Sequence, residues 1–154
     1  MKPVQNWLAE YAESHQNPIN IMIHWICVPL IMLSIIGLLA NINIPFSDDY
    51  PSFNHAGFLL IILGFIYYFF LSKTLLLGMI PISFTMLKII QELSTLSYPL
   101  WLISLIIFIV SWIGQFYGHK IEGKKPSFFK DIQFLMIGPL WLLSKLYKKL
   151  GISI

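Results

Sequence analysis

The chain has 154 residues, of which 57% are hydrophobic and 11% are charged, and its mean hydropathy is +0.76. Soluble domains are about 45–50% apolar and about 25% charged, so this composition excludes an ordinary soluble domain and indicates an integral membrane protein. The basic residues are all lysines, and they outnumber the acidic ones to give a formal net charge of +3. They gather at 120–130 and 145–149, which favours contact with an anionic membrane face and not with nucleic acid.

In chain order, residues 3–16 have the pattern of an amphipathic helix, with Trp7, Leu8 and Tyr11 on one side. Pro18 is expected to end that helix and to allow another to start. Four apolar stretches then approach the length of about 20 residues that crosses a bilayer. The second and third are short, and we expect them to form a tilted hairpin. The four stretches run at about Ile21–Ile42, Gly57–Leu71, Thr74–Ile90 and Tyr98–Phe116.

The last segment, residues 131–151, is interrupted by Gly138 and Pro139 and ends in lysines. This pattern is typical of an interfacial or re-entrant helix and not of a full span. The sequence therefore predicts an all-α fold, an integral membrane helical bundle of about four transmembrane helices with an N-terminal amphipathic helix and a C-terminal interfacial or re-entrant helix. The length suits one membrane-embedded domain over residues 1–154. Cys27 is the only cysteine, so no intrachain disulfide can form.

The placement of the lysines predicts the orientation in the membrane. Lys2 precedes the first stretch, Lys73 lies between the second and third, and four lysines follow the fourth, whereas the 43–55 loop has none. Because the lysine-rich side faces the cytoplasm, we expect both termini there, with Lys88 as the exception to the pattern. The net charge and the lack of a recognisable targeting peptide favour a bacterial inner membrane, or the endoplasmic reticulum if the protein is eukaryotic.

Three of the four histidines are expected at one membrane face. His15 and His24 flank the start of the first apolar stretch, and His119 lies just past the end of the fourth. Metal-bound imidazole usually has its second nitrogen held by a polar group. Each of these histidines has a polar residue one helical turn earlier, on the same face: Tyr11, Asn20 and Gln115. The three histidines therefore predict a shared metal site.

Other interpretations remain open on the residues alone. A single histidine at a helix end is most often an interfacial residue without a ligand, and this reading suits His55 best. Glu122 is a candidate fourth ligand, a general base or a surface carboxylate. Histidine and carboxylate ligands suit non-haem iron, although their spacing also allows zinc, manganese or copper. Further alternatives are a haem held by His24 and His119, a zinc hydrolase, and a transporter or assembly factor with structural histidines.

Two blocks of the sequence resemble those of a known family. The block "YAESHQNPINIMIHWICVPL" contains Tyr11-x3-His15-x4-Asn20-x3-His24. The block "GQFYGHKIEGKKPSFFKDIQFLMIGPLWLL" contains Gln115-x2-Gly118-His119, and then Glu122, Pro126 and Gly138-Pro139. Both are similar to the signature blocks of the membrane 2-hydroxy fatty acid dioxygenases. The resemblance covers essentially the whole chain, with only hydrophobic similarity between the two blocks.

The resemblance implies iron(II)- and O2-dependent α-oxidation, in which a 2-hydroxy fatty acid is shortened by one carbon. It implies that His15, His24 and His119 hold Fe(2+), with Glu122 as a further candidate catalytic residue. In eukaryotic members the histidine-to-glutamate spacing is one residue longer than here, which argues against a ligand role for Glu122.

The substrate would bind through its hydroxyl and carboxylate oxygens, with its tail among the membrane spans. Three lysines are candidates to neutralise that carboxylate at the membrane surface: Lys120, Lys124 and Lys125. The partners implied are thus a 2-hydroxy fatty acid, O2 and membrane lipid, with no nucleic acid. The oligomeric state is left open.

Overall fold

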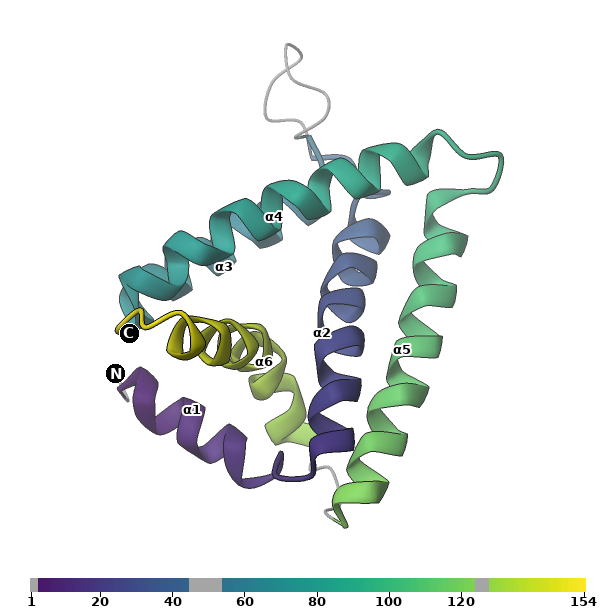
Figure 1. The fold of residues 1–154 in the computed structure, drawn as a ribbon. Helices are drawn as coiled ribbons and strands as arrows, with labels where there is room; N and C mark the ends of the chain where they lie inside the picture. The colour runs from purple at the N-terminus through teal and green to yellow at the C-terminus, as the bar shows by residue number, and fades with distance from the viewer. Residues whose placement is uncertain (1–2, 45–53, 124–127) are drawn as a thin grey trace.

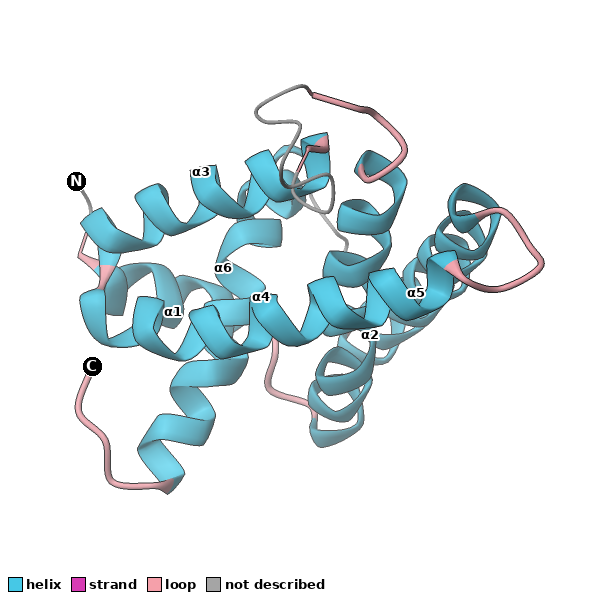
Figure 2. Ribbon diagram, turned by 90° about the horizontal axis from the view of Figure 1, so that it is seen from above, coloured by secondary structure: helices cyan, strands magenta, loops and turns pink. Residues whose placement is uncertain are grey.

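The computed structural model describes residues 3–44, 54–123 and 128–154, and only the backbone of residues 128–133. Within these ranges the regular secondary structure is helical, apart from an isolated bridge between Asn43 and His55 (Figures 1 and 2). The predicted all-α fold is confirmed. The helices are α1 (Val4–Glu13), α2 (Pro18–Leu39), α3 (Ala56–Leu71), α4 (Lys73–Ser94), α5 (Leu100–Glu122) and α6 (Phe128–Lys149).

Local capping explains where α2 begins and where α5 ends. The Asn17 side chain accepts a hydrogen bond from the Ile19 N–H at 2.9 Å, and Pro18 occupies the first turn, where its missing N–H costs nothing. Gly123 ends α5 with a φ of 72°, a left-handed conformation that favours glycine. Because α5 extends beyond the apolar stretch that the sequence predicts, His119 lies in its last turn and not in the loop that follows.

Three of the described helices, α2, α4 and α5, are long and apolar enough to cross a membrane. The fourth apolar helix, α3, has 16 residues and is shorter than the about 20 that a perpendicular span needs. α3 and α4 pack against each other as the expected hairpin, and Figure 1 shows both inclined to the α2–α5 pair. A helical membrane protein is therefore supported, and the fourth span stays a prediction.

α2 and α5 run side by side in opposite directions (Figure 1), and glycines line their contact. A Cβ atom on Gly114 would lie 2.7 Å from Cys27 Sγ, and one on Gly118 would collide with Asn20 Oδ1. Only glycine permits so close an approach of the two backbones. Gly114 and Gly118 have the small-xxx-small spacing by which helices associate in membranes. This seam brings His119, the next residue, against the first turns of α2.

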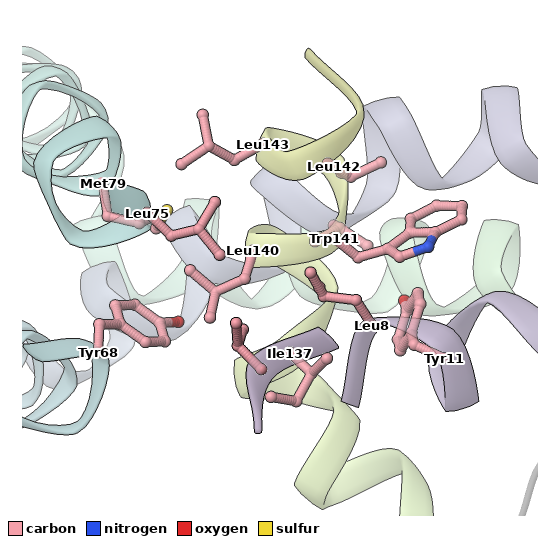
Figure 3. Packing of buried hydrophobic residues seen from close by; sticks show 12 residues of the cluster. Leu8, Tyr11, Tyr68, Leu75, Met79, Ile137, Leu140, Trp141, Leu142 and Leu143 are labelled. Carbon is pink, nitrogen blue, oxygen red and sulfur yellow. The ribbon is translucent and has the colours of Figure 1, made fainter. Parts of the chain in front are cut away.

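α6 passes through the middle of the molecule (Figure 1). Residues 137–144 are all buried, which covers every side of the helix over two turns. Figure 3 shows Trp141 beside Tyr11 of α1, and Leu140 on the side that faces α3 and α4. The interruption expected at Pro139 is not found, because the helix continues through it. A helix lying flat in a membrane interface buries one face, so α6 is part of the protein core.

We expect Gly118→Ala to destabilise the protein by about 1–3 kcal/mol, the usual cost of overpacking. The added methyl group would meet Asn20, which is fully buried and cannot move aside. Gly64→Ala is the matched control, since its Cβ would meet Met136 Cε at an ordinary 3.6 Å. Thermal unfolding in detergent measures both variants. Equal midpoints for Gly118→Ala and the wild type would contradict the close packing of α2 and α5.

Candidate metal centre

The three histidines singled out by the sequence come together in space. His15 lies in the turn between α1 and α2, His24 lies inside α2, and His119 lies at the end of α5. One ring nitrogen from each falls within 4.8 Å of the other two. The His15 and His24 side chains are buried, with exposed fractions of 3% and 1%, and His119 is partly buried. The three side chains are therefore close enough together to bind one metal ion.

Hydrogen bonds fix which nitrogens of His15 and His24 carry protons. His15 Nδ1 lies 2.6 Å from the Tyr11 carbonyl oxygen, and His24 Nδ1 lies 2.9 Å from the Asn20 carbonyl oxygen. A carbonyl oxygen can only accept, so each Nδ1 must be the donor. In a neutral imidazole the other nitrogen, Nε2, then presents its lone pair.

These two Nε2 atoms face each other at 2.8 Å. Two lone pairs at that distance repel each other unless a cation lies between or beside them. A proton on one ring is disfavoured, because burial lowers the pKa of His15 to about 4. A metal ion accepts both lone pairs at once, while the Nδ1–H groups stay on their carbonyls, which is the usual arrangement of metal-bound histidine. The donor set therefore fits a metal ion.

Aromatic rings close the side of the centre formed by α1 and α6. The Tyr11 ring stacks on His15, with centroids 4.1 Å apart and planes 2° from parallel. The Trp141 ring lies 5.3 Å from His15 and 5.2 Å from Tyr11. Trp141 belongs to the buried stretch of α6, so the packing of the core also holds the His15 ring in place.

Glu122 lies outside the three-histidine group, and hydrogen bonds engage both of its oxygens. Oε1 accepts from the Gln16 N–H at 2.8 Å, and Oε2 accepts from the Asn17 N–H at 2.9 Å and from Asn20 Nδ2 at 3.0 Å. Bonds to a charged carboxylate are the stronger kind. Glu122 thus ties the end of α5 to the turn that carries His15.

The three polar residues placed one turn before the histidines act differently from one another. Tyr11 and Asn20 hold His15 and His24 through backbone carbonyls, where the sequence pattern predicted side chains. The Asn20 side chain donates a hydrogen bond to Glu122 instead. Gln115 is buried in α5, one turn before the last histidine.

The structure describes one of the three lysines proposed for the substrate carboxylate. Lys120 is exposed on the last turn of α5, and Lys124 and Lys125 lie outside the described residues. Sequence reasoning missed Lys145, whose Nζ lies 4.2 Å from the centre of the Trp141 ring. The sequence indicates only that Trp141 and Lys145 share a face of the helix, because they are four residues apart.

Comparison with known proteins places the chain in a family. Residues 1–150 match the family described as 2-hydroxy-palmitic acid dioxygenase Mpo1-like. The chain belongs to the Mpo1-like family. The resemblance that the two sequence blocks predict is thus confirmed.

A member of this family from Saccharomyces cerevisiae, the 2-hydroxy-palmitic acid dioxygenase MPO1, is 27% identical over 150 residues. The match covers 96% of this chain and 82% of the yeast protein. No solved structure matches the chain. The Mpo1-like assignment supports an oxidoreductase acting on 2-hydroxy fatty acids.

We expect Glu122→Gln to lower the affinity for metal by roughly 10- to 100-fold, as changes to groups that orient metal ligands usually do. A glutamine lacks the charge and cannot offer acceptors to all three donors that Glu122 holds. Competition with a chelator of known affinity measures the effect. Glu92→Gln, at an exposed position on α4, is the control. An unchanged affinity in Glu122→Gln would mean that this carboxylate does not position the histidines.

Proposed function

We propose that the protein is an iron(II)- and O2-dependent dioxygenase that shortens 2-hydroxy fatty acids by one carbon. The observation that carries the proposal is the pair of Nε2 atoms of His15 and His24, which face each other at 2.8 Å in a buried site. The printed name of the yeast relative supplies the substrate class and the reaction type.

In this proposal His15, His24 and His119 hold Fe(2+). The carbonyls of Tyr11 and Asn20 set the orientation of the first two rings. Three neutral nitrogen ligands suit iron, since imidazole is a common ligand of that metal. When bound, iron(II) would supply the redox chemistry toward O2 and positions for the hydroxyl and carboxylate oxygens of a 2-hydroxy acid.

The residues around the histidines have supporting roles. We assign Gln115 to the orientation of His119, since it precedes that residue by one turn on the same helix. Glu122 positions the turn that carries His15, because its oxygens are engaged by donors from that turn. The stacked Tyr11 ring excludes water from one side of the centre, which strengthens electrostatic interactions within it.

The acyl tail would lie along α2. Between α2, α3, α4 and α6 is an apolar cavity of about 150 Å³, lined in part by Met32, Ile36 and Met136. From His24 to Ile36 α2 rises by about 18 Å, at about 1.5 Å per residue. That is comparable to the length of an extended hexadecanoyl tail. We therefore assign the cavity to the far end of the tail.

The centre would sit at one face of the membrane. His24 lies near the start of α2 and His119 at the end of α5, and these ends of the two antiparallel helices lie together (Figure 1). We assign this face to the cytoplasm from the distribution of lysines, in a bacterial inner membrane or in the endoplasmic reticulum of a eukaryote. There the polar head of the substrate meets the centre and its tail stays in the apolar interior.

We expect His119→Ala to reduce O2 uptake on 2-hydroxypalmitate by more than about 100-fold, because it removes one of three metal ligands. The yield of the C15 acid product, measured by mass spectrometry, should fall together with O2 uptake. His55→Ala is the control. His55 is outside the metal-binding group and caps α3 by accepting from the Phe58 N–H at 3.1 Å. It should lose only about 1 kcal/mol of stability and keep its activity.

Three results would contradict the proposed function. One is a wild-type protein that consumes no O2 with 2-hydroxypalmitate after iron(II) is added. Another is a Soret band, which would show that the histidines hold haem. The third is turnover that does not depend on O2, which would point to a hydrolase.

A further inference from the structure

Lys145 is a charged residue of α6 that lies one aromatic ring away from the histidine centre. It follows Trp141 by one turn of α6, and its ammonium lies over the Trp141 ring at 4.2 Å from the ring centre. The centre of that ring also lies 5.3 Å from that of His15 and 5.2 Å from that of Tyr11. A cation over the face of an indole is held there electrostatically, so the position of the ammonium is defined.

No described carboxylate is in ion-pair contact with Lys145. The Glu122 carboxylate instead accepts hydrogen bonds from backbone N–H groups of the turn between α1 and α2. The Lys145 side chain is partly buried, and burial together with the Lys148 ammonium lowers its pKa. A partly buried ammonium without a counter-ion is costly, and an incoming anion relieves that cost.

Lys145 differs in position from the lysines that the sequence singled out. Lys120 follows His119 directly, but it is exposed on the outer side of α5. Lys145 comes from a different helix, and its ammonium lies over the Trp141 ring, whose centre is 5.3 Å from that of the His15 ring. A carboxylate has two oxygens, so one can face the histidines while the other accepts from the ammonium.

We propose that Lys145 binds the carboxylate of the 2-hydroxy fatty acid and that Trp141 holds its ammonium ready for that anion. The proposal rests on the proposed function, because it takes the substrate class from it. Lys145 is thus a binding residue that selects an acid over a neutral lipid of the same length. The acyl tail is then directed along α2, toward the apolar cavity.

The test measures binding without turnover. Full-length, iron(II)-loaded protein in detergent is titrated anaerobically with 2-hydroxypalmitate and, separately, with 1,2-hexadecanediol, which keeps the hydroxyl and the tail but has no carboxylate. Lys145→Met removes the charge and keeps an unbranched side chain, whereas Lys145→Arg keeps the charge. Lys149→Met, at an exposed position on the same helix, is the control.

We expect Lys145→Met to weaken binding of the acid roughly 10- to 100-fold, the value of a hydrogen bond to a charged group, and to leave the diol unchanged. Lys145→Arg should restore most of the affinity, and Lys149→Met should match the wild type. Iron content should be equal in all four proteins.

Two outcomes overturn the proposal. If Lys145→Met binds the acid as the wild type does, Lys145 is not the carboxylate partner. If it weakens acid and diol equally, its role is structural. A wild-type protein that does not bind 2-hydroxypalmitate at all would overturn the proposed function as well, so the two failures are distinguishable.

Discussion

The structure of the site depends on one constraint: the Nε2 atoms of His15 and His24 face each other with their lone pairs. His15 and His24 each give their Nδ1–H to a backbone carbonyl, and this leaves both Nε2 atoms without protons at 2.8 Å. In water such a pair would move apart or take up a proton. Here burial disfavours the proton and packing prevents the separation. The arrangement is stable when a cation satisfies both nitrogens, and the third histidine is placed to share it.

Helix packing supplies the force that holds the nitrogens together. Glycines at positions 114 and 118 let α5 approach α2 closely, so that His119 reaches the first turns of α2. Glu122 then joins the end of α5 to the turn between α1 and α2 through two backbone N–H groups. α6 also contacts this turn, because Trp141 packs on the ring of His15. Each of these contacts joins segments far apart in the chain, so the site is assembled from α2, α5, α6 and the turn between α1 and α2.

Much of the fold and of the histidine site could be predicted from the sequence. Apolar stretches of near-spanning length give the helices, and lysine placement brings three histidines to one end of them. Boundaries were less certain, because hydropathy does not detect the polar last turn of α5 in which His119 lies. Pro139 was expected to interrupt the last helix, but its neighbours support the chain there. The Tyr68 hydroxyl donates to the Met136 carbonyl in that same region at 2.9 Å.

The rest could not be predicted, for physical reasons. The donors to Glu122 are backbone N–H groups of a distant turn, and nothing in the residue types of Gln16 and Asn17 marks them as partners. The Gly114-x3-Gly118 spacing is a sequence signal for a close helix pair, but it does not say which helix packs against α5. The proximity of Lys145 to the histidines depends on how α6 crosses the molecule, which periodicity alone does not give.

X-ray absorption at the iron edge, on protein loaded anaerobically with iron(II) in detergent, tests the shared metal site most directly. The wild type should retain one iron per chain with scattering from three imidazoles, and His24→Ala should lose the iron or one of those imidazoles. A wild type that retains no iron, or that shows the same iron environment as His24→Ala, would contradict the assignment of His15, His24 and His119 as the ligands of one iron.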